Sequence, residues 1–390
     1  MLINNWYVAA TSQEVSNKPH HTRMVGVDFV LFRSEGGKLN CLSDVCCHRG
    51  GALHRGEIVG DCIACPYHGW EFNGEGQCTK IPAMEGDITI PKRARIDSYP
   101  VEEYMGLIWV FVGDQSEQDR PTIPNWFEPF IDNQEWRVTR GNYEWTDCNW
   151  ERLCENSLDT SHLSFVHKRF GNRLSAKANI VPIKATEHGA TVTRSRTAPL
   201  LSQKRGGVAG LLPKDRKTTK VTVEWSMIGL AEMLYQEMTT DITQVLFSLR
   251  TPLDFNTVRS YTLQARNFLL EPEHDADRLQ LLFEATKEDH DILRHLKPRC
   301  NGLSTTNELL VESDGMELMF RSKVAEWRDL GRYVDDIELE KSGRREVYVA
   351  PSPARGAEPK GWVHKIIPTI TAKLTLALCF ISVTNLILFR

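Results

Sequence analysis

The chain has 390 residues, of which 41% are hydrophobic and 25% are charged, as in an ordinary globular protein. That length exceeds what a single hydrophobic core usually holds, so we expect two domains. A formal charge of −4 provides no basic field for a phosphate backbone, which argues against nucleic-acid binding. Ten cysteines are too few for a disulfide scaffold, and the start MLINNWYVAA lacks the basic region and apolar run of a signal peptide. We therefore expect a reducing, cytoplasmic setting in which thiols are free to bind metal.

The first part of the chain has the pattern of β-structure. An apolar, β-branched run from Met24 to Phe32 is followed by Gly36-Gly37 and a second short run, which predicts a hairpin. The segment from Tyr104 to Gly113 predicts a buried strand that closes this unit. We expect a domain over residues 1–115 and a linker over 116–140, where the sequence is polar and contains proline.

The next two hundred residues mix strand and helix patterns, and we expect a second domain over residues 141–340. The run from Lys220 to Met227 predicts a strand, and the stretch from Cys148 to Val166 predicts helix. Apolar residues at helical spacing between Arg278 and Leu296 predict a further helix.

The C-terminal part of the chain changes character twice. Residues 341–365 are rich in Arg, Lys, Pro, Gly and Ser and are typical of a linker. Residues 366–390 form an apolar tail, in which 369–389 is long enough to cross a bilayer as a helix. The preceding linker has six Lys or Arg against two Glu, which would hold that side in the cytoplasm. The pattern predicts a C-terminal membrane anchor; the alternative is an amphipathic or packed C-terminal helix.

Two glycine-rich loops in the first domain each contain one cysteine and one histidine. The first has Cys46-x-His48, and the second follows sixteen residues later with Cys65-x-x-His68. Such a set would suit a structural zinc ion. Zinc fingers, however, usually pair like ligands within each arm. A two-iron cluster with two thiolates on one iron and two imidazoles on the other is served by mixed loops, because each loop then reaches both metals.

These loops, including CPYHGW at Cys65–Trp70, resemble the Rieske [2Fe–2S] signature of ring-hydroxylating and related Rieske oxygenases. The resemblance implies that Cys46 and Cys65 hold one iron and that His48 and His68 hold the other. Cys47 stands where a proline is more common in the family. The extra cysteine pair of respiratory Rieske proteins is missing, so we expect no disulfide beside the cluster.

The family resemblance also implies the fold. We expect an α+β protein with an all-β Rieske domain, followed by a helix-grip (START-like) catalytic domain with an antiparallel sheet and flanking helices.

A second group of candidate ligands lies between Asn149 and Phe170. It has the spacing Glu155-x3-Asp159-x2-His162-x4-His167. On a regular helix the first three would share one face. The two histidines would lie about 140° apart around that helix, so it must end or bulge between them if both bind one metal.

This spacing resembles the mononuclear iron motif of the same family, whose metal is held by two histidines and one carboxylate. The resemblance implies His162 and His167 as the histidines. In the later segment ATKEDHDILRHLKP, Asp289 falls at the position of the carboxylate, and Asp291 is the alternative. Asp159 would be a bridging acid that accepts a hydrogen bond from His162 and contacts His68 of a neighbouring subunit in a homotrimer.

Two segments are most similar to homotrimeric monooxygenases and O-demethylases: LINNWYVAA at the N-terminus, and CPYHGWEFNGEGQCTKIPA, which begins at Cys65. This resemblance implies one [2Fe–2S] cluster and one mononuclear Fe(II) per chain, and an oxygenase that uses dioxygen to hydroxylate or oxidatively demethylate a small organic substrate. We find neither a dinucleotide-binding glycine fingerprint nor a plant-type ferredoxin cysteine run, so a separate reductase or ferredoxin must supply the electrons. The alternative function is a Rieske electron-transfer or redox-sensing protein without oxygenase chemistry, with two irons per chain instead of three.

Overall fold

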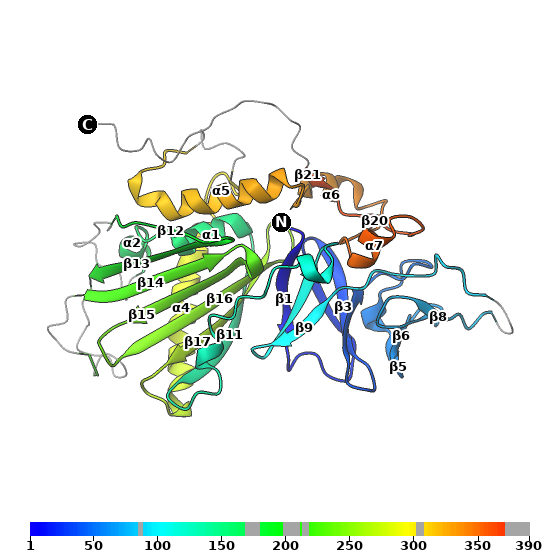
Figure 1. Ribbon diagram of the computed structural model, residues 1–390, viewed down its shortest axis with the longest axis horizontal. Helices are drawn as coiled ribbons and strands as arrows, with labels where there is room; N and C mark the ends of the chain where they lie inside the picture. Colours follow the sequence, from blue (N-terminus) through cyan, green and yellow to red (C-terminus); the bar gives the residue numbers. More distant parts are fainter. Residues whose placement is uncertain (85–88, 168–179, 198–210, 213–217, 302–307, 371–390) are drawn as a thin grey trace.

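The computed structural model describes residues 1–84, 89–167, 180–197, 211–212, 218–301 and 308–370. An all-β N-terminal domain lies beside a domain in which helices cover one large antiparallel sheet (Figure 1). This is the α+β architecture predicted from the sequence.

The N-terminal domain consists of three small antiparallel sheets. They are β1 (Asn5–Thr11), β10 (Leu107–Val112) and β9 (Val101–Tyr104); β2 (His20–Met24), β3 (Val27–Arg33) and β4 (Leu39–Ser43); and β5 (Glu57–Val59), β6 (Cys62–Ala64), β7 (Glu71–Phe72) and β8 (Cys78–Lys80). The predicted hairpin is confirmed as β3 and β4, with Gly37 at a φ of 83° in its turn. The predicted closing strand is β10, and all six of its residues are buried.

The second domain is organised around a seven-stranded sheet. Its strands run in the order β11 (Arg137–Trp145), β17 (Val258–Arg266), β16 (Thr243–Pro252), β15 (Ala231–Glu237), β14 (Thr218–Ser226), β13 (Gly189–Thr197) and β12 (Lys184–Ala185), and every neighbouring pair is antiparallel. The helices α1 (Trp150–Leu158), α4 (Asp275–Leu293) and α5 (Gly315–Asp329) pack against it. Gly141 of β11 faces α4, since a Cβ at this position would lie 3.4 Å from the Phe283 ring, in ordinary van der Waals contact.

The two domains share one hydrophobic core across their boundary. Asn5 of β1 donates to the carbonyl of Met227 at 2.9 Å, and the hydroxyl of Thr251 in β16 donates to the carbonyl of Val8 at 2.7 Å. Part of the predicted linker 116–140 also packs into this core, where fully buried Phe127 stacks on Phe247 at 5.9 Å. The large sheet is therefore fixed relative to β1.

The chain returns to the N-terminal domain after α5. The elements β18 (Tyr333–Val334), α6 (Asp336–Ser342), β19 (Tyr348–Val349), α7 (Pro353–Ala357), β20 (Lys365–Ile366) and β21 (Thr369–Ile370) follow, and β18 pairs with β21 while β19 pairs with β20. Residues 341–365, predicted as a linker from their composition, thus contain short ordered elements and the buried ion pair of Arg355 with Asp97. Composition alone gave no sign of this pair, because Arg355 meets its partner only in the folded chain.

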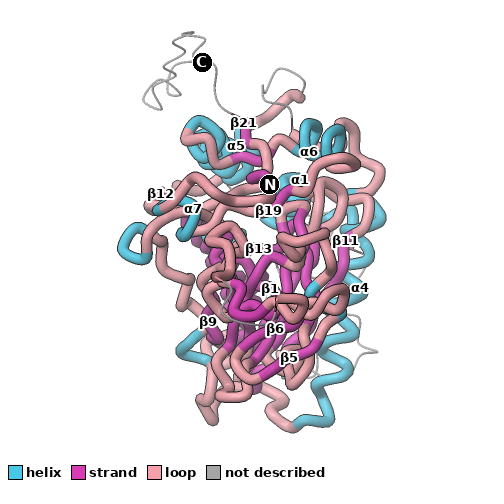
Figure 2. The backbone as a smooth tube through the Cα atoms, turned by 90° about the vertical axis from the view of Figure 1, so that its right-hand side faces the viewer, coloured by secondary structure: helices cyan, strands magenta, loops and turns pink. Residues whose placement is uncertain are grey.

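The predicted anchor over 366–390 begins with strand residues, since Ile366 and Thr369 belong to β20 and β21. Its remaining residues, 371–390, lie outside the described part of the chain. Within the described part, no helix is long and apolar enough to cross a membrane. Viewed from the end that carries β5 and β6, α4 runs down one side of the molecule and α5 lies near the top (Figure 2).

Candidate metal centres

The two Cys/His loops of the N-terminal domain adopt the same hydrogen-bonded turn. In the first, the amide of Gly50 donates to the carbonyl of Cys46 at 2.9 Å, and the amide of Cys46 donates to the carbonyl of Gly51 at 2.9 Å. In the second, Gly69 donates to Cys65 at 2.9 Å, and Cys65 donates to Trp70 at 2.8 Å. Gly50 and Gly69 have φ values of 71° and 70°, which a residue with a side chain rarely adopts. The glycines therefore permit both turns.

The turns bring the four predicted ligands together. The thiols of Cys46 and Cys65 are buried and lie close enough to alter each other's pKa, with burial the main cause that raises the pKa of Cys65. The rings of His48 and His68 are exposed, with centroids 4.5 Å apart, and His48 stacks on Trp70 at 4.6 Å. Thiols thus lie inside and imidazoles outside, and this ligand set fits a cluster with one thiolate-bound and one imidazole-bound iron.

Gly51 leaves room beside the thiols. A Cβ at this position would lie 2.8 Å from Sγ of Cys65, which is closer than side-chain atoms approach each other. A side chain here would displace the sulfur, so the free space at Gly51 fits the approach of a cluster.

In the second domain, the helix predicted over Cys148–Val166 is interrupted. The first helix, α1, ends at Leu158, and Asp159 is extended, with a φ of −68° and a ψ of 138°. The short helix α2 (Leu163–Val166) begins after His162 and ends before His167, which is again extended. The helix does end before His167, but the predicted common helical face of Asp159 and His162 was wrong, since they are not on one helix.

A turn, not a helix face, brings Asp159 to His162. Its carboxylate accepts from the amides of Ser161 at 2.6 Å and His162 at 3.2 Å, and it lies 3.3 Å from Nδ1 of His162. Burial acts to raise the pKa of Asp159, but these hydrogen bonds outweigh it and hold that pKa below its usual value. Asp159 is therefore charged at neutral pH.

The two histidines converge on Asp289 of α4. Nε2 of His162 lies 3.5 Å and Nε2 of His167 lies 3.4 Å from the same carboxylate oxygen, Oδ1 of Asp289. All three ligand atoms lie within 4.8 Å of one another. Two imidazoles and one carboxylate with this convergence match the ligand set of non-heme Fe(II) oxygenases.

The two carboxylates that the sequence left open differ in their surroundings. The side chain of Asp291 is 72% exposed and forms an ion pair with Arg294 at 3.4 Å. Asp289 is largely buried, and its Oδ1 has no hydrogen-bond donor among the described residues. Burial raises the pKa of Asp289, and the neighbouring His167 and His162 offset only part of this effect. A divalent cation would compensate the negative charge of this buried carboxylate oxygen.

His162, His167 and Asp289 are called the triad below. Each of its two histidines is oriented by a further carboxylate. Nδ1 of His162 faces Asp159, and Nδ1 of His167 lies 3.1 Å from Glu288. A carboxylate on one ring nitrogen leaves the other unprotonated toward a metal. The role of Glu288 was not predicted, although the acidic pair Glu288-Asp289 was a signal for it.

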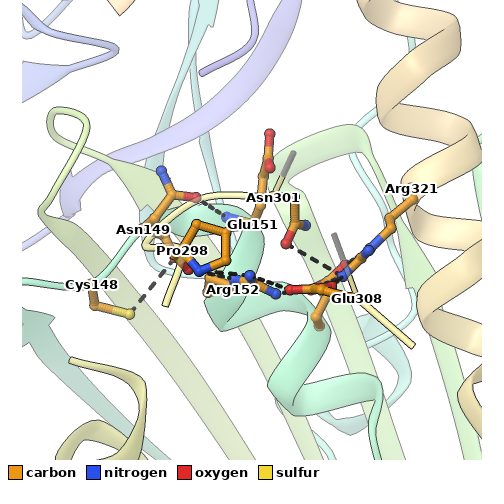
Figure 3. A network of polar contacts seen from close by, with 9 residues as sticks. Cys148, Asn149, Glu151, Arg152, Pro298, Asn301, Glu308 and Arg321 are labelled. Carbon is orange, nitrogen blue, oxygen red and sulfur yellow. Dashed lines mark hydrogen bonds and ion pairs between the residues drawn. The ribbon is translucent and has the colours of Figure 1, made fainter. Parts of the chain in front are cut away.

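A network of buried charges holds α1, which leads into Asp159, against α5. Glu155 forms ion pairs with Arg152 of its own helix and with Arg321 of α5. Both arginines also bind Glu308 (Figure 3). Arg152 further donates to the carbonyl of Pro298 at 3.1 Å. Glu155 is therefore a buried ion-pair partner and not a surface charge. It fixes α1, the helix that directly precedes Asp159 and His162.

Among the other histidines, His290 is satisfied within the core by Tyr143 at 2.9 Å and the carbonyl of Thr146 at 2.7 Å. One histidine group was missed. His21 and His54 lie beside Asp44 in the N-terminal domain, and no sequence spacing pointed to them.

Comparison with known proteins gives a family match for each part of the chain. Residues 5–100 match the Rieske [2Fe-2S] domain, and residues 146–330 match the vanillate O-demethylase oxygenase C-terminal domain. The toluene-4-sulfonate monooxygenase system iron-sulfur subunit TsaM1 of Comamonas testosteroni is 32% identical over 312 residues, which cover 75% of this chain and 87% of the relative. The chain belongs to the Rieske oxygenases.

Other relatives of this Rieske oxygenase agree. The dicamba O-demethylase oxygenase component of Stenotrophomonas maltophilia is 38% identical over 165 residues, which are 42% of this chain and 47% of that protein. The crystal structure of dicamba monooxygenase bound to 3,6-dichlorosalicylic acid has a TM-score of 0.70 at 24% identity, covering 84% of this chain and 97% of the other. A Pseudomonas putida CBB5 NdmA mutant with theobromine has a TM-score of 0.68 at 22% identity, covering 84% and 90%. The last two likenesses establish the fold, and the family assignment establishes a [2Fe–2S] cluster and a mononuclear iron as the cofactors.

Proposed function

We propose that this Rieske oxygenase uses dioxygen and externally supplied electrons to hydroxylate or oxidatively demethylate a small organic molecule. The observation that carries the proposal is the approach of Nε2 of both His162 and His167 to one buried oxygen of Asp289. A protein that only carried electrons would need no second ligand set of this kind.

The proposed ligands follow from this geometry. His162, His167 and Asp289 would hold the mononuclear iron, which when bound supplies the activation of dioxygen. Cys46 and Cys65 would hold one iron of the cluster, and His48 and His68 would hold the other.

Two carboxylates beside the triad, Asp159 and Glu288, orient its histidines. Asp159 and Glu288 accept hydrogen bonds from the Nδ1–H groups of His162 and His167, which fixes each ring and leaves its Nε2 lone pair free for a metal that Asp289 would also bind. Because Asp159 is charged at neutral pH, it can also accept a further hydrogen bond from outside this group of residues.

We propose that Asp159 meets His68 of a neighbouring subunit in a homotrimer. Within one chain, the sheet β5–β8 that flanks His68 and the helix α2 beside His162 lie at opposite ends of the molecule (Figure 1). Electrons therefore have a long path inside one chain, and a neighbouring copy would shorten it. Asp159→Asn should keep both metals but slow turnover at least about tenfold, because it removes a charge and not a ligand. Normal turnover of this variant, or a monomeric mass for the active protein in solution, would contradict the arrangement.

The function is tested by iron content and coupled oxygen uptake. Protein loaded anaerobically should contain three irons per chain, and Asp289→Ala should contain two with the visible cluster spectrum unchanged. With a surrogate reductase, oxygen uptake should be coupled to product from one of the compounds named for the relatives, beginning with toluene-4-sulfonate, dicamba and vanillate. Two irons per chain in the unaltered protein would favour the electron-carrier alternative.

The proposed domain limits remain 1–115 and 141–340.

The proposal of a membrane-binding tail concerns residues 371–390, and a chain that ends at Ile370 tests it. If the full chain and this shortened chain distribute equally between membrane and soluble fractions, the tail is not an anchor.

A further inference from the structure

The N-terminal domain contains a third convergence of metal-binding side chains, which the oxygenase chemistry does not use. His21, Asp44 and His54 each direct one ligand atom into a region where the three atoms lie within 4.8 Å of one another. His21 belongs to β2, Asp44 follows β4, and His54 lies in the short 3₁₀ helix Leu53–Arg55. Three separate elements therefore supply one compact set of donors.

A carboxylate outside the proposed ligand set already holds His21 in place. Nε2 of His21 lies 3.1 Å from Asp28, and Arg23 fixes Asp28 with bonds of 3.0 and 3.1 Å. Histidine ligands of metals commonly have one ring nitrogen bonded to a carboxylate in this way, which leaves the other nitrogen for the ion. The Asp28 contact thus resembles the carboxylates that orient His162 and His167.

Asp44 is the central group of the cluster. Its side chain is only 4% exposed, whereas those of His54 and His21 are 26% and 42% exposed. Asp44 accepts from the amide of His54 at 2.7 Å and lies 2.5 Å from Nδ1 of His54, and the His21 and His54 rings are 4.6 Å apart. A buried carboxylate beneath two more accessible imidazoles forms a site that an ion can enter from solvent.

We propose that His21, Asp44 and His54 bind one divalent transition-metal ion of the zinc class. Imidazole nitrogen and carboxylate oxygen are ligands that zinc accepts, and three protein ligands leave a fourth position for water. Zinc binds such a site more tightly than iron(II) does, so zinc is the appropriate probe.

The ion would brace the first cluster loop. Asp44 is two residues before Cys46, and its carbonyl accepts from the amide of Leu53 at 2.9 Å, directly before His54. Asp44 and His54 therefore lie at the two ends of the loop that carries Cys46 and His48. An ion bound by His21 as well would connect both ends to β2. Because a ligand stabilises the state that binds it, zinc should make the cluster more resistant to heat. This inference does not depend on oxygenase activity.

The test is zinc binding by the full-length, iron-loaded protein. After equilibrium dialysis against a series of zinc chloride concentrations, the zinc content per chain is measured by mass spectrometry. The unaltered protein should bind one zinc more than His21→Gln/His54→Gln at low zinc, and the double variant should bind at least about tenfold more weakly at this site. Zinc that enters the iron triad is present in both proteins and cancels in the difference. His20→Gln is the matched control, because it removes the neighbouring imidazole on the same strand and should bind like the unaltered protein.

Two further measurements keep the test decisive. If the double variant loses its cluster, the single variant His21→Gln, which changes a half-exposed ring, must still bind zinc at least about tenfold more weakly. Zinc should also raise the temperature at which the visible cluster absorbance is lost, in the unaltered protein and in His20→Gln but not in His21→Gln. Equal zinc binding by the unaltered protein and His21→Gln would show that these residues form only an ion-pair cluster, and would overturn the proposal.

Discussion

The buried pair of Asp97 and Arg355 should hold the C-terminal segment onto the N-terminal domain. Asp97 is 1% exposed, and it accepts from Nε of Arg355 at 2.6 Å, from Nη2 at 2.9 Å and from the hydroxyl of Ser352 at 2.7 Å. The change Arg355→Met keeps most of the side-chain volume but removes two of these three donors. A carboxylate charge then stays buried with only one hydroxyl to compensate it.

The size of the effect follows from this geometry. Removing one partner of a buried ion pair typically lowers the free energy of unfolding by about 3–5 kcal/mol, because the remaining charge is uncompensated. A chain of 390 residues that unfolds as one unit has an unfolding entropy of about 0.8 kcal/mol/K at its midpoint. The midpoint of thermal unfolding should therefore fall by about 4–6 °C in Arg355→Met.

Scanning calorimetry of the iron-loaded protein measures this shift. The exposed Arg345→Met in the same segment is the control, and its midpoint should change by less than about 1 °C. The double change Asp97→Asn/Arg355→Met should recover part of the loss, since no charge is left buried. If Arg355→Met unfolds within about 1 °C of the unaltered protein, the pair does not stabilise the fold and the reasoning fails.

Three further predictions concern the two metal centres and one buried acid. Asp289→Asn should lower the mononuclear iron content while Asp291→Asn leaves it unchanged; the opposite result in metal analysis would mean that the exposed carboxylate is the ligand. Gly51→Ala should reduce the visible cluster absorbance per chain, because its Cβ would meet Sγ of Cys65 at 2.8 Å, whereas Gly36→Ala, with its nearest neighbour at 3.7 Å, should not; equal absorbance in both would contradict the close approach. Burial raises the pKa of Glu317 from 4.5 to about 8, so the folded state holds this proton more tightly than the unfolded chain. The unaltered protein should therefore lose about 1.4 kcal/mol per pH unit relative to Glu317→Gln between pH 5 and 8, and parallel unfolding midpoints across that range would exclude it.

The sequence by itself determined the chemistry of the ligand sets. The mixed loops around Cys46 and Cys65 predicted a two-iron cluster, because each loop carries one ligand for each iron. The spacing of His162 and His167 predicted a mononuclear iron site through its resemblance to the motif of the Rieske oxygenases. The buried strand β10 and the helix α4 were also predictable, since periodic apolar residues report locally on which face is buried.

Only the tertiary structure decided which groups meet across the chain. Asp289 and Asp291 are both acids on one helix; the resemblance favoured Asp289, but only the fold shows that Asp289 of α4 lies beside the two histidines. The same is true of Glu288 beside His167, of Arg355 within an apparent linker, and of His21 near Asp44 and His54. Folding alone brings these partners together, and a buried member such as Asp97 or Asp44 requires a partner because an isolated polar group in the interior would lose its hydration without compensation.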